Sequence, residues 1–531
     1  MLSEARARER KARWSWARLG VSVCAVGQSQ THRLLPGGSN RLTSSGVVER
    51  RLERPSRRVL GPGAGISNEA SGLGPAARYP QLRPRPHGAT RGEVCSNQRA
   101  RLCAAMIELV AAYGYGASTV ADLCALAGVS KRTLYERFAG KQECFLAAFE
   151  MVVSRAARRI VAAQDGERDW RARLCLAFAT FAEEVANDPR GAQLVLVEAF
   201  GAGPAALERM ERTNALLEGI VSSSFDQAPG DLAVGPIVVK GIVAGVARVA
   251  RVRLMDGRSH ELPRLAGELS EWMLSYRSSA AARLDGLPRG MAPARPAAVA
   301  PAPERQDLPR ADDRARILRA TAELVAEQGY GQLSVERIVA GTGMSARIFF
   351  GLFDGVEQCF LTALELLSGQ ALELAGRAGF AGEDWPGGVY RAVVALMDRI
   401  ARDAVFQRVA FVEVFALGPS GLHLRERLMA SCAAGLRESA PSECLPSELV
   451  LEASVGAVWG IVHHHVACGR ARQLPALAGQ LAYVLLTPIV GADAAVQGIL
   501  DEHARLFAVS RGGGGGGGGQ VSSPMVGHTT R

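Results

Sequence analysis

An internal repeat with an offset of 215 residues constrains the fold of this 531-residue chain more than any other feature. Identical glycine, aromatic and charged residues coincide under this offset: Arg99 with Arg314, Gly128 with Gly343, Phe138 with Phe353, Trp170 with Trp385, Glu198 with Glu413, and Gly241 with Gly456. A three-residue change of offset further along aligns Leu262-Pro263 with Leu474-Pro475. A register without gaps over more than a hundred residues indicates a duplicated unit, so the chain is expected to hold two copies of one fold.

Helical periodicity recurs from Arg99 onward with almost no alternating strand pattern, which predicts an all-α protein. The length favours roughly two to four domains. Proline, glycine and arginine content and helical periodicity set the expected boundaries. We expect a disordered Arg/Gly/Pro-rich arm at 1–95, a small helical domain (the first head) at 96–156 with a motif at 119–138, and a larger helical domain (the first body) at 157–276. A Pro/Ala/Arg linker at 277–310 leads to a degenerate second head at 311–371 (motif 334–353), a second body at 372–510 and a Gly-rich disordered tail at 511–531.

The first head is organised around the stretch 119–138, which has the pattern of two short helices joined by a tight turn. Thr119 or Ser118 can cap the first helix, and Gly128 stands where the chain reverses and needs a positive φ. Ser130 can cap the second helix, whose Leu134 is expected to face inward. A short, capped helix that starts with cations and hydroxyls is what a helix-turn-helix places in a DNA major groove.

This head resembles the DNA-binding head of the TetR family of transcriptional repressors. The resemblance is carried by Gly114-Tyr115, Thr119, Gly128-Val129-Ser130, Leu134-Tyr135, Phe138 and Lys141 within the segment LVAAYGYGASTVADLCALAGVSKRTLYERFAGKQECFLAAF. It implies a ligand-responsive regulator, a repressor, that binds a double-stranded DNA operator and a small-molecule effector in the cytoplasm. It also implies that the regulatory bodies pair through a four-helix bundle and that the effector changes the spacing of the heads.

The residue types around Ser130 indicate which side chains would contact DNA. Arg132 and Lys131 can donate to guanine edges, and Thr133 can contact a base or a thymine methyl group. Phosphate contacts suit Thr119, Tyr135, Lys141 and the helix N-terminal amides, and Arg137 is expected to face outward. The alternative is that these are solvated polar positions of an ordinary helical domain.

The second head differs from the first on its recognition helix. Lys131, Thr133, Tyr135, Glu136 and Lys141 are replaced in the second copy by Ala346, Ile348, Phe350, Gly351 and Val356. Arg347 remains as the candidate base or phosphate donor. Residues 98–148 carry six cations against four anions, whereas residues 313–363 carry five against six. The second head is therefore expected to keep the fold and to lack most of the reading surface.

Net charge alone does not argue for DNA binding here. The formal charge of +10 comes from residues 1–97, which hold sixteen Arg and one Lys against six Glu, so the rest of the chain sums to −1. This arm is either a basic extension that strengthens DNA binding without reading sequence, or a segment without function.

The tandem layout allows two assemblies. The two bodies can pack on each other within one chain as an intrachain pseudo-dimer, which favours an asymmetric operator, or chains can form a homodimer through one unit. A sensor or protein-interaction module with vestigial DNA binding is the alternative function. We expect no enzyme, because no nucleophile–base set or paired catalytic carboxylates stand out, and no cofactor.

Three further features bear on metal binding, on buried charges and on the cellular compartment. His464 and Cys468 have a usable ligand spacing, but two ligands make no metal site, so no metal is expected and a polar pocket lining is favoured. Glu198 and Glu413 recur in apolar stretches, where each could meet a ligand, an arginine in a pocket or a helix-packing ion pair. Ten scattered cysteines without a CxxC pair fit a reduced cytosol, and no apolar run reaches the length of a membrane span.

Overall fold

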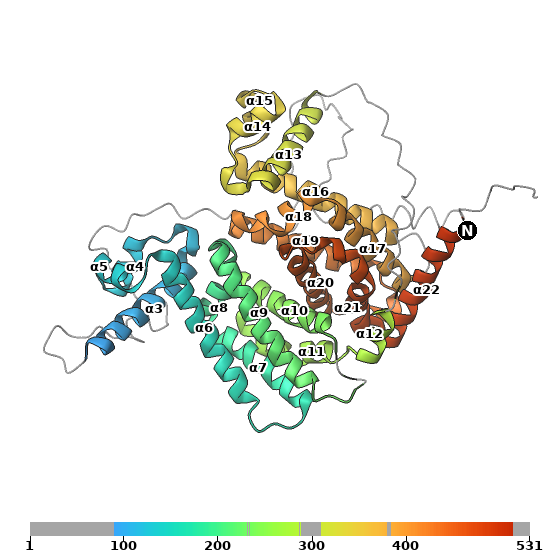
Figure 1. The fold of residues 1–531 in the computed structure, drawn as a ribbon, viewed down its shortest axis with the longest axis horizontal. Coiled ribbons are helices and arrows are strands. Elements are labelled where there is room, and N and C mark those ends of the chain that lie inside the picture. The colour runs from blue at the N-terminus through green and yellow to red at the C-terminus, as the bar shows by residue number, and fades with distance from the viewer. Residues whose placement is uncertain are drawn as a thin grey trace, which may run out of the picture.

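The computed structural model describes residues 90–230, 232, 234–285, 287, 309–379 and 384–512. These residues form helices joined by short turns, with no strand among them, as expected for an all-α protein (Figure 1). The predicted arm as far as residue 89, residues 288–308 of the predicted linker and the tail from 513 lie outside the described residues.

The first unit begins with a head of three helices and continues into a helical body. Its elements are α3 (Arg91–Ala117), α4 (Val120–Ala127), α5 (Lys131–Arg137), α6 (Lys141–Ala163), α7 (Trp170–Asn187), α8 (Pro189–Leu196), the 3-10 helix η1 (Glu198–Gly201), α9 (Pro204–Phe225), α10 (Pro236–Met255), η2 (Ser259–Glu261), α11 (Leu262–Met273) and α12 (Ser278–Asp285).

The second unit repeats this order. Its elements are α13 (Pro309–Gln328), η3 (Tyr330–Gln332), α14 (Val335–Thr342), α15 (Ala346–Leu352), α16 (Val356–Gly379), α17 (Trp385–Arg402), α18 (Ala404–Phe411), η4 (Glu413–Leu417), α19 (Pro419–Ser439), η5 (Ser442–Cys444), α20 (Glu448–Ala467), η6 (Ala471–Leu477), α21 (Ala478–Val490) and α22 (Ala492–Gly512). Two tandem units, each a head and a body, are thus confirmed.

The two bodies pack against each other within one chain, with α10 lying along α20 (Figure 1). The helices α11 and α21 complete a four-helix bundle with this pair. The indole of Trp272, on α11, donates a hydrogen bond to the Ser454 hydroxyl on α20 (3.0 Å), and the Tyr276 hydroxyl donates to the Val484 carbonyl on α21 (3.1 Å). This pairing within the chain is the arrangement expected of an intrachain pseudo-dimer.

Close approach of α10 and α20 depends on glycine. A Cβ added at Gly245 would lie 2.5 Å from the Ala453 carbonyl oxygen, and one added at Gly241 would lie 3.3 Å from the Ala457 Cβ. An offset of 212 residues pairs Gly241 with Ala453 and Gly245 with Ala457. The pseudo-twofold relation between the units then converts the Gly245–Ala453 contact into the Gly241–Ala457 contact, as a symmetric pairing of α10 and α20 requires. The three-residue change of offset therefore falls before these helices, and the sequence-based match of Gly241 with Gly456 is wrong.

The boundary between the units lies later than the sequence indicated. Residues 278–285, which the sequence assigned to the linker, form α12, which packs on α21 and α22 of the second unit and buries Leu284. The backbone N–H of Arg277 donates to the Tyr483 hydroxyl (2.8 Å), which itself donates to the Arg277 carbonyl (2.9 Å). The first unit thus ends docked on the second, an arrangement that composition alone does not indicate.

One stretch of the described helices, Ala471–Val490, is long and apolar enough to cross a membrane by length and composition. The sequence had predicted no apolar run of this length. About 56% of the residues in its most apolar window are buried, because η6 and α21 pack against α17 and α20 in the core of the paired bodies. Burial in this core accounts for the apolar composition.

Candidate nucleic-acid interface and ligand pocket

The turn of the first head is built from local side chain-to-backbone bonds. Thr119 caps α4 by accepting from the Asp122 N–H (3.2 Å), and Ser130 caps α5 by accepting from the Thr133 N–H (3.0 Å). Between them Gly128 adopts the left-handed conformation, with φ 61°. Leu134 is fully buried, so α5 packs on the head by one face and leaves the opposite face to solvent.

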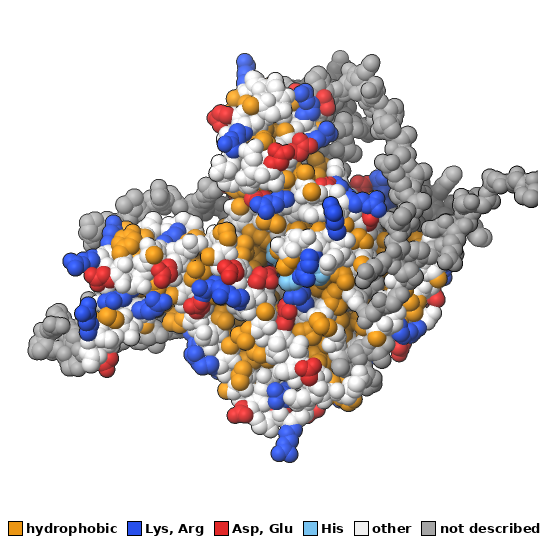
Figure 2. All heavy atoms as spheres, viewed as in Figure 1, with side chains coloured by type: hydrophobic (Ala, Val, Ile, Leu, Met, Phe, Trp, Pro, Cys, Tyr) orange, Lys and Arg blue, Asp and Glu red, His pale blue; other side chains and the backbone are white. Residues whose placement is uncertain are grey.

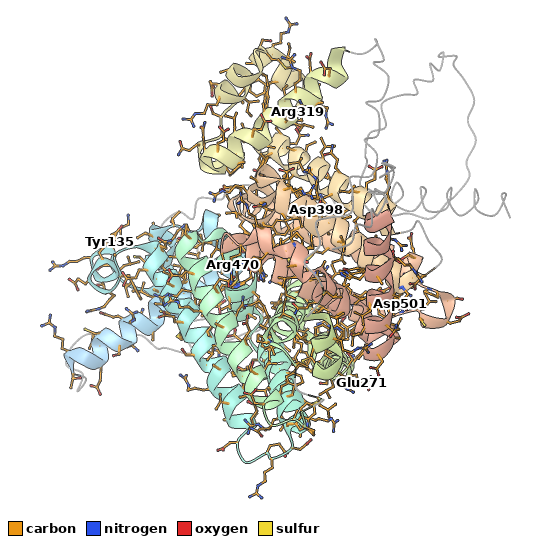
Figure 3. All side chains as sticks on the ribbon, turned by 45° about the vertical axis from the view of Figure 1, so that its right-hand side comes forward. Tyr135, Glu271, Arg319, Asp398, Arg470 and Asp501 are labelled. Atoms are coloured by element: carbon orange, nitrogen blue, oxygen red, sulfur yellow. The ribbon has the colours of Figure 1, made fainter. Side chains whose placement is uncertain are left out.

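The outward face of α5 carries the side chains that the sequence selected. Lys131 and Arg132 are exposed, and the Arg132 side chain keeps 90% of its accessible surface while it pairs with Glu136 (3.0 Å). Tyr135 is 58% exposed and lies at the outer edge of the head, away from the bodies (Figure 3). Thr133 is half-buried beside the Ser130 cap.

Arg137 and Lys141 have partners inside the head instead. The half-buried Arg137 guanidinium donates to the Gln98 side-chain oxygen (3.3 Å), which ties α5 to α3. The Lys141 ammonium donates to the carbonyls of Tyr115 (2.9 Å) and Ser118 (3.0 Å), and burial lowers its pKa. The Arg137 guanidinium is thus bound to α3 at the surface of the head, and Lys141 holds the turn between α3 and α4.

A buried arginine under the motif was missed by sequence reasoning. Arg101 on α3 donates to the carbonyls of Ala127 and Gly128, and burial lowers its pKa. Its counterpart Arg316 donates to the Thr342 carbonyl (2.9 Å). Both groups satisfy carbonyls at the C-terminus of the first motif helix. Their recurrence at the 215-residue offset was the signal that could have found them.

The second head keeps the motif's geometry and presents a different surface. Ser345 caps α15 by accepting from the Ile348 N–H (3.4 Å), and Gly343 has φ 69°. The outward side chains of α15 include Phe350, which is 60% exposed, Ile348, and the exposed Arg347. An apolar face of this kind offers few donors to phosphates or base edges.

Each head joins its body through a buried glutamate. The Glu198 carboxylate, at the start of η1, accepts from the Tyr115 backbone N–H (2.9 Å), next to Gly114 with φ 78°. Burial raises the pKa of Glu198. Of the roles left open by the sequence, the structure therefore assigns Glu198 to a hydrogen bond between head and body.

The second joint repeats the first and lies against it. Glu413 accepts from the Tyr330 backbone N–H (2.9 Å) and also pairs with Arg408 (2.7 Å), so it makes an ion pair as well. The rings of Phe200 and Phe415, on η1 and η4, stack across the unit boundary with centroids 4.8 Å apart. The head–body connection of the first unit therefore packs directly against that of the second unit.

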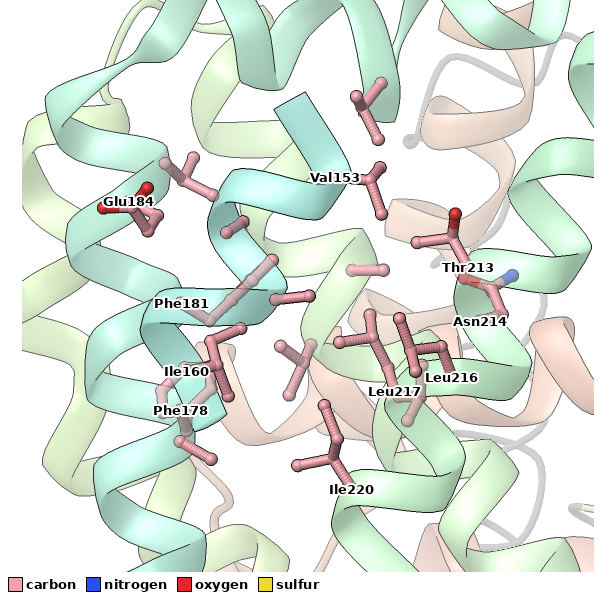
Figure 4. Close-up of a pocket in the computed structure, with 18 of the residues that line it drawn as sticks. Val153, Ile160, Phe178, Phe181, Glu184, Thr213, Asn214, Leu216, Leu217 and Ile220 are labelled. Carbon is pink, nitrogen blue, oxygen red and sulfur yellow. The ribbon is translucent and has the colours of Figure 1, made fainter. Parts of the chain in front are cut away.

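The first body contains an apolar pocket between α6, α7, α9 and α10, with about 1190 Å³ of empty space including its open mouth. Figure 4 shows Ile160, Phe178 and Leu217 among the side chains that face this space, with Thr213 and Asn214 at its edge. Sequence reasoning did not find these residues, because apolar helical positions look alike whether they line a cavity or fill a core.

Two positions that line this pocket carry larger side chains in the second unit. Met210 and Ala247 line the first pocket, and their counterparts at the two offsets are Arg425 and Trp459. The Arg425 guanidinium lies 4.6 Å from the Trp459 ring centroid. Trp459 also stacks on His463, with centroids 4.9 Å apart.

Metal ligands do not cluster in the described part of the chain, where no group of three or more His, Cys, Asp or Glu side chains could hold an ion. His464 Nε2 accepts from Arg470 (2.8 Å) and lies 3.9 Å from the Cys468 sulfur. His464 also lines a cavity between the units, so it is a polar residue in a pocket lining, as the sequence favoured.

Two helix-turn-helix heads carried on paired helical bodies define a DNA-binding regulator of the helix-turn-helix class. The family model for bacterial regulatory proteins, tetR family, matches residues 102–148 and 317–363, which are the two heads. Both heads therefore match the DNA-binding domain of the tetR family of bacterial regulatory proteins, in two tandem copies.

No curated protein matches the chain. Among solved structures, it is similar to the fatty acid degradation regulator FadR from Bacillus halodurans (16% identity, TM-score 0.31), covering 33% of this chain and 94% of that one. FadR from Bacillus subtilis, in complex with stearoyl-CoA, shows 17% identity and a TM-score of 0.31 over 33% and 97% of the two chains. A TetR-like transcriptional regulator from Rhodococcus sp. RHA1 shows 16% identity and a TM-score of 0.30 over 34% and 96%.

Proposed function

We propose that this chain is a ligand-responsive transcriptional repressor whose first head reads operator DNA, whose first body binds a small-molecule effector, and whose second unit is a covalently attached partner. It acts in the cytoplasm as a single-chain pseudo-dimer and is not an enzyme. The observation that carries the proposal is the contrast between the two recognition helices: the outward face of α5 is cationic and bears hydroxyl groups, whereas that of α15 is mainly apolar.

Recognition is assigned to residues of the first head that face outward. Arg132 and Lys131 donate to base edges, Thr133 contacts a base or thymine methyl group, and Tyr135 contacts a phosphate. Thr119 and Ser130 contribute through the capped helix N-termini that they hold, since free N–H groups at a helix start attract phosphate. Lys141 and Arg137 are assigned to positioning the motif, because their polar groups are bound inside the head.

The second head contributes less to DNA affinity. Arg347 contacts a phosphate, which adds affinity without sequence information. Because the two heads differ, the preferred operator is asymmetric, with one half-site read in detail and the other contacted mainly through its backbone.

The effector acts through α6, which runs without a break from the head to the pocket. Its first half buries Phe145 and Phe149 in the core of the head, and its second half contributes Val152 and Ile160 to the pocket wall. A ligand that widens the pocket therefore displaces a rigid element of the head. Coupling of about 1–3 kcal/mol between ligand and DNA gives a 5- to 150-fold change in operator affinity.

The test begins with DNA. Fragments of the protein's own genome are retrieved by the purified full chain and sequenced, and binding to the recovered operator is then measured for variants. Lys131→Ala combined with Arg132→Ala is expected to lower affinity at least tenfold and to remove sequence preference, since a bidentate base contact contributes about 1–3 kcal/mol.

Arg347→Ala, the matched change in the second head, is expected to weaken binding equally for all sequences and to reduce the salt dependence by about one unit of slope. Unchanged operator binding by the Lys131/Arg132 double variant would overturn the proposal and favour a sensor or interaction module with vestigial DNA binding.

A further inference from the structure

A second cavity lies between the two units and adjoins the apolar pocket of the first. It has about 700 Å³ of empty space including its mouth, and its lining comes from both units. Figure 2 shows histidine side chains at the surface between the units, in the middle of the face drawn. The two cavities share five lining residues: Leu196, Met210, Asn214, Val243 and Ala247. They therefore meet at a wall built mainly of small or flexible side chains.

The inter-unit cavity is cationic on one side. Arg248 and Arg251 line it, and both bond to one carboxylate, that of Glu426 on α19 (3.0 and 3.4 Å). A third guanidinium, that of Arg425, donates to the same carboxylate (2.6 Å). All four side chains are buried, with relative exposures of 3% for Arg248, 8% for Arg251, 3% for Arg425 and 8% for Glu426.

Other acids near the cavity do not balance this cluster. Glu218 is paired with Lys240 (2.7 Å). Glu211, which also lines the cavity, faces His464 (3.5 Å), whose pKa is lowered by burial, so the Glu211 carboxylate keeps its negative charge, but its side chain is 39% exposed to water. On α20, the Glu452 carboxylate pairs with Arg253 (3.0 Å), and only its backbone carbonyl accepts from Arg248. Three guanidinium groups thus share one carboxylate, which leaves a surplus of two positive charges in a buried cluster.

Such a surplus is costly away from water. Burial, together with the charge of Arg425, lowers the pKa of Arg251 to about 9, and the cationic neighbours lower that of Glu426 to about 2 against the opposing effect of burial. The Nε and Nη1 groups of Arg425 have no hydrogen-bond partner, and its guanidinium carbon lies over the rings of Phe200 and Trp459, which both line the cavity. An anion in this cavity would offset the surplus charge.

We infer that the effector is an elongated amphipathic anion, with its apolar part in the first-unit pocket and its anionic oxygens in the inter-unit cavity beside Arg248 and Arg251. This inference rests on the proposed function and adds the chemical class of the ligand. It assigns the second unit a share in ligand binding, through Trp459, His463 and the Glu426 cluster. The apolar pocket alone would accept a neutral molecule, so the charge of the ligand is the discriminating property.

The test uses the full chain and titration calorimetry with matched probes. Dodecanoate is expected to bind at least tenfold more tightly than dodecanol, which has the same chain without the charge. Dodecyl phosphate is expected to bind as dodecanoate does, and inorganic phosphate alone at least tenfold more weakly than either. Equal affinity for dodecanoate and dodecanol, or no binding of dodecanoate, overturns the inference.

Two variants locate the two parts of the ligand. Arg251→Gln is expected to weaken dodecanoate at least tenfold and to leave dodecanol within twofold. Ala247→Trp copies Trp459 of the second unit into the wall between the cavities and is expected to weaken both amphiphiles, whereas Ala162→Trp, at an exposed position of α6, leaves them unchanged. An Arg251→Gln variant that binds dodecanoate normally overturns the anionic subsite.

Failure of the inference is distinguishable from failure of the proposed function. Operator binding by the first head is measured without any amphiphile, so its loss in the Lys131/Arg132 variant stands whichever ligand binds. If a neutral ligand displaces the operator and dodecanoate does not, the regulator proposal survives and the anionic class is refuted.

Discussion

Replacing Gly245 with alanine tests the packing of the two units at its closest point. The new Cβ would lie 2.5 Å from the Ala453 carbonyl oxygen and 2.8 Å from the Trp272 ring. Ordinary C···O contact is about 3.3–3.6 Å, so α10 and α20 must separate by close to 1 Å or bend. The nearest atom is backbone, which cannot rotate away as a flexible side chain would.

The expected magnitude follows from a matched control. Alanine in place of glycine inside a helix gains about 1 kcal/mol of propensity, and overpacking costs about 1–3 kcal/mol. Gly219 on α9 is exposed, and a Cβ there would meet nothing within 4 Å. Gly219→Ala should therefore stabilise the chain, and Gly245→Ala should have an unfolding free energy about 1–3 kcal/mol below that of Gly219→Ala.

The assay is urea unfolding of both variants and the parent chain, followed by fluorescence and circular dichroism. A lower midpoint for Gly245→Ala with an unchanged slope indicates lost stability rather than a changed denatured state. If Gly245→Ala stabilises the chain as much as Gly219→Ala does, α10 and α20 are not packed at this position, and the intrachain pairing is refuted.

Three further outcomes follow from buried groups and caps. Glu198→Ala removes the acceptor of a buried backbone N–H at the head–body joint and should lower the unfolding free energy by about 1–3 kcal/mol, with less than half of that for Glu198→Gln; equal losses in urea unfolding would argue against the hydrogen bond. Burial, with the charge of Arg425, lowers the pKa of His463 to about 3 from 6.5, so the unfolded chain binds a proton that the folded chain excludes between these values. Stability should therefore fall by about 2 kcal/mol from pH 6.5 to pH 5, and His463→Gln should flatten that slope. Ser130→Ala and Ser345→Ala should each cost about 1 kcal/mol as lost N-caps, but the first should weaken operator binding more than the second in a fluorescence anisotropy titration.

Local signals made the head predictable from the sequence. Each cap, at Thr119 and at Ser130, bonds to a backbone N–H three residues further along, and Gly128 accepts the left-handed conformation by itself. The local spacing of these residues therefore determines the geometry of the turn. The exposure of Lys131 and Arg132 follows from the periodicity that buries Leu134. Because the sequence repeats, the fold predicted for the first unit could also be predicted for the second.

The partners of side chains far apart in the sequence could not be predicted. Glu198 bonds to the Tyr115 backbone across 83 residues, and Arg248 bonds to Glu426 across 178. A three-residue change of offset before α10 also shifted the correspondence of the bundle helices. If the 215-residue offset is kept throughout, His463 corresponds to Arg248, whereas the packing of α10 on α20 pairs His463 with Arg251. The packing of the first head on its body shows the first of these relations, and the packing of the two bodies shows the others.

The most direct test of the whole account is the mass of protein bound to one operator duplex. Size-exclusion chromatography with multi-angle light scattering on the saturated complex should give one chain of 56.2 kDa per operator, since both heads and the paired bodies belong to one polypeptide. Two chains per operator, with no binding by the single chain, would contradict it.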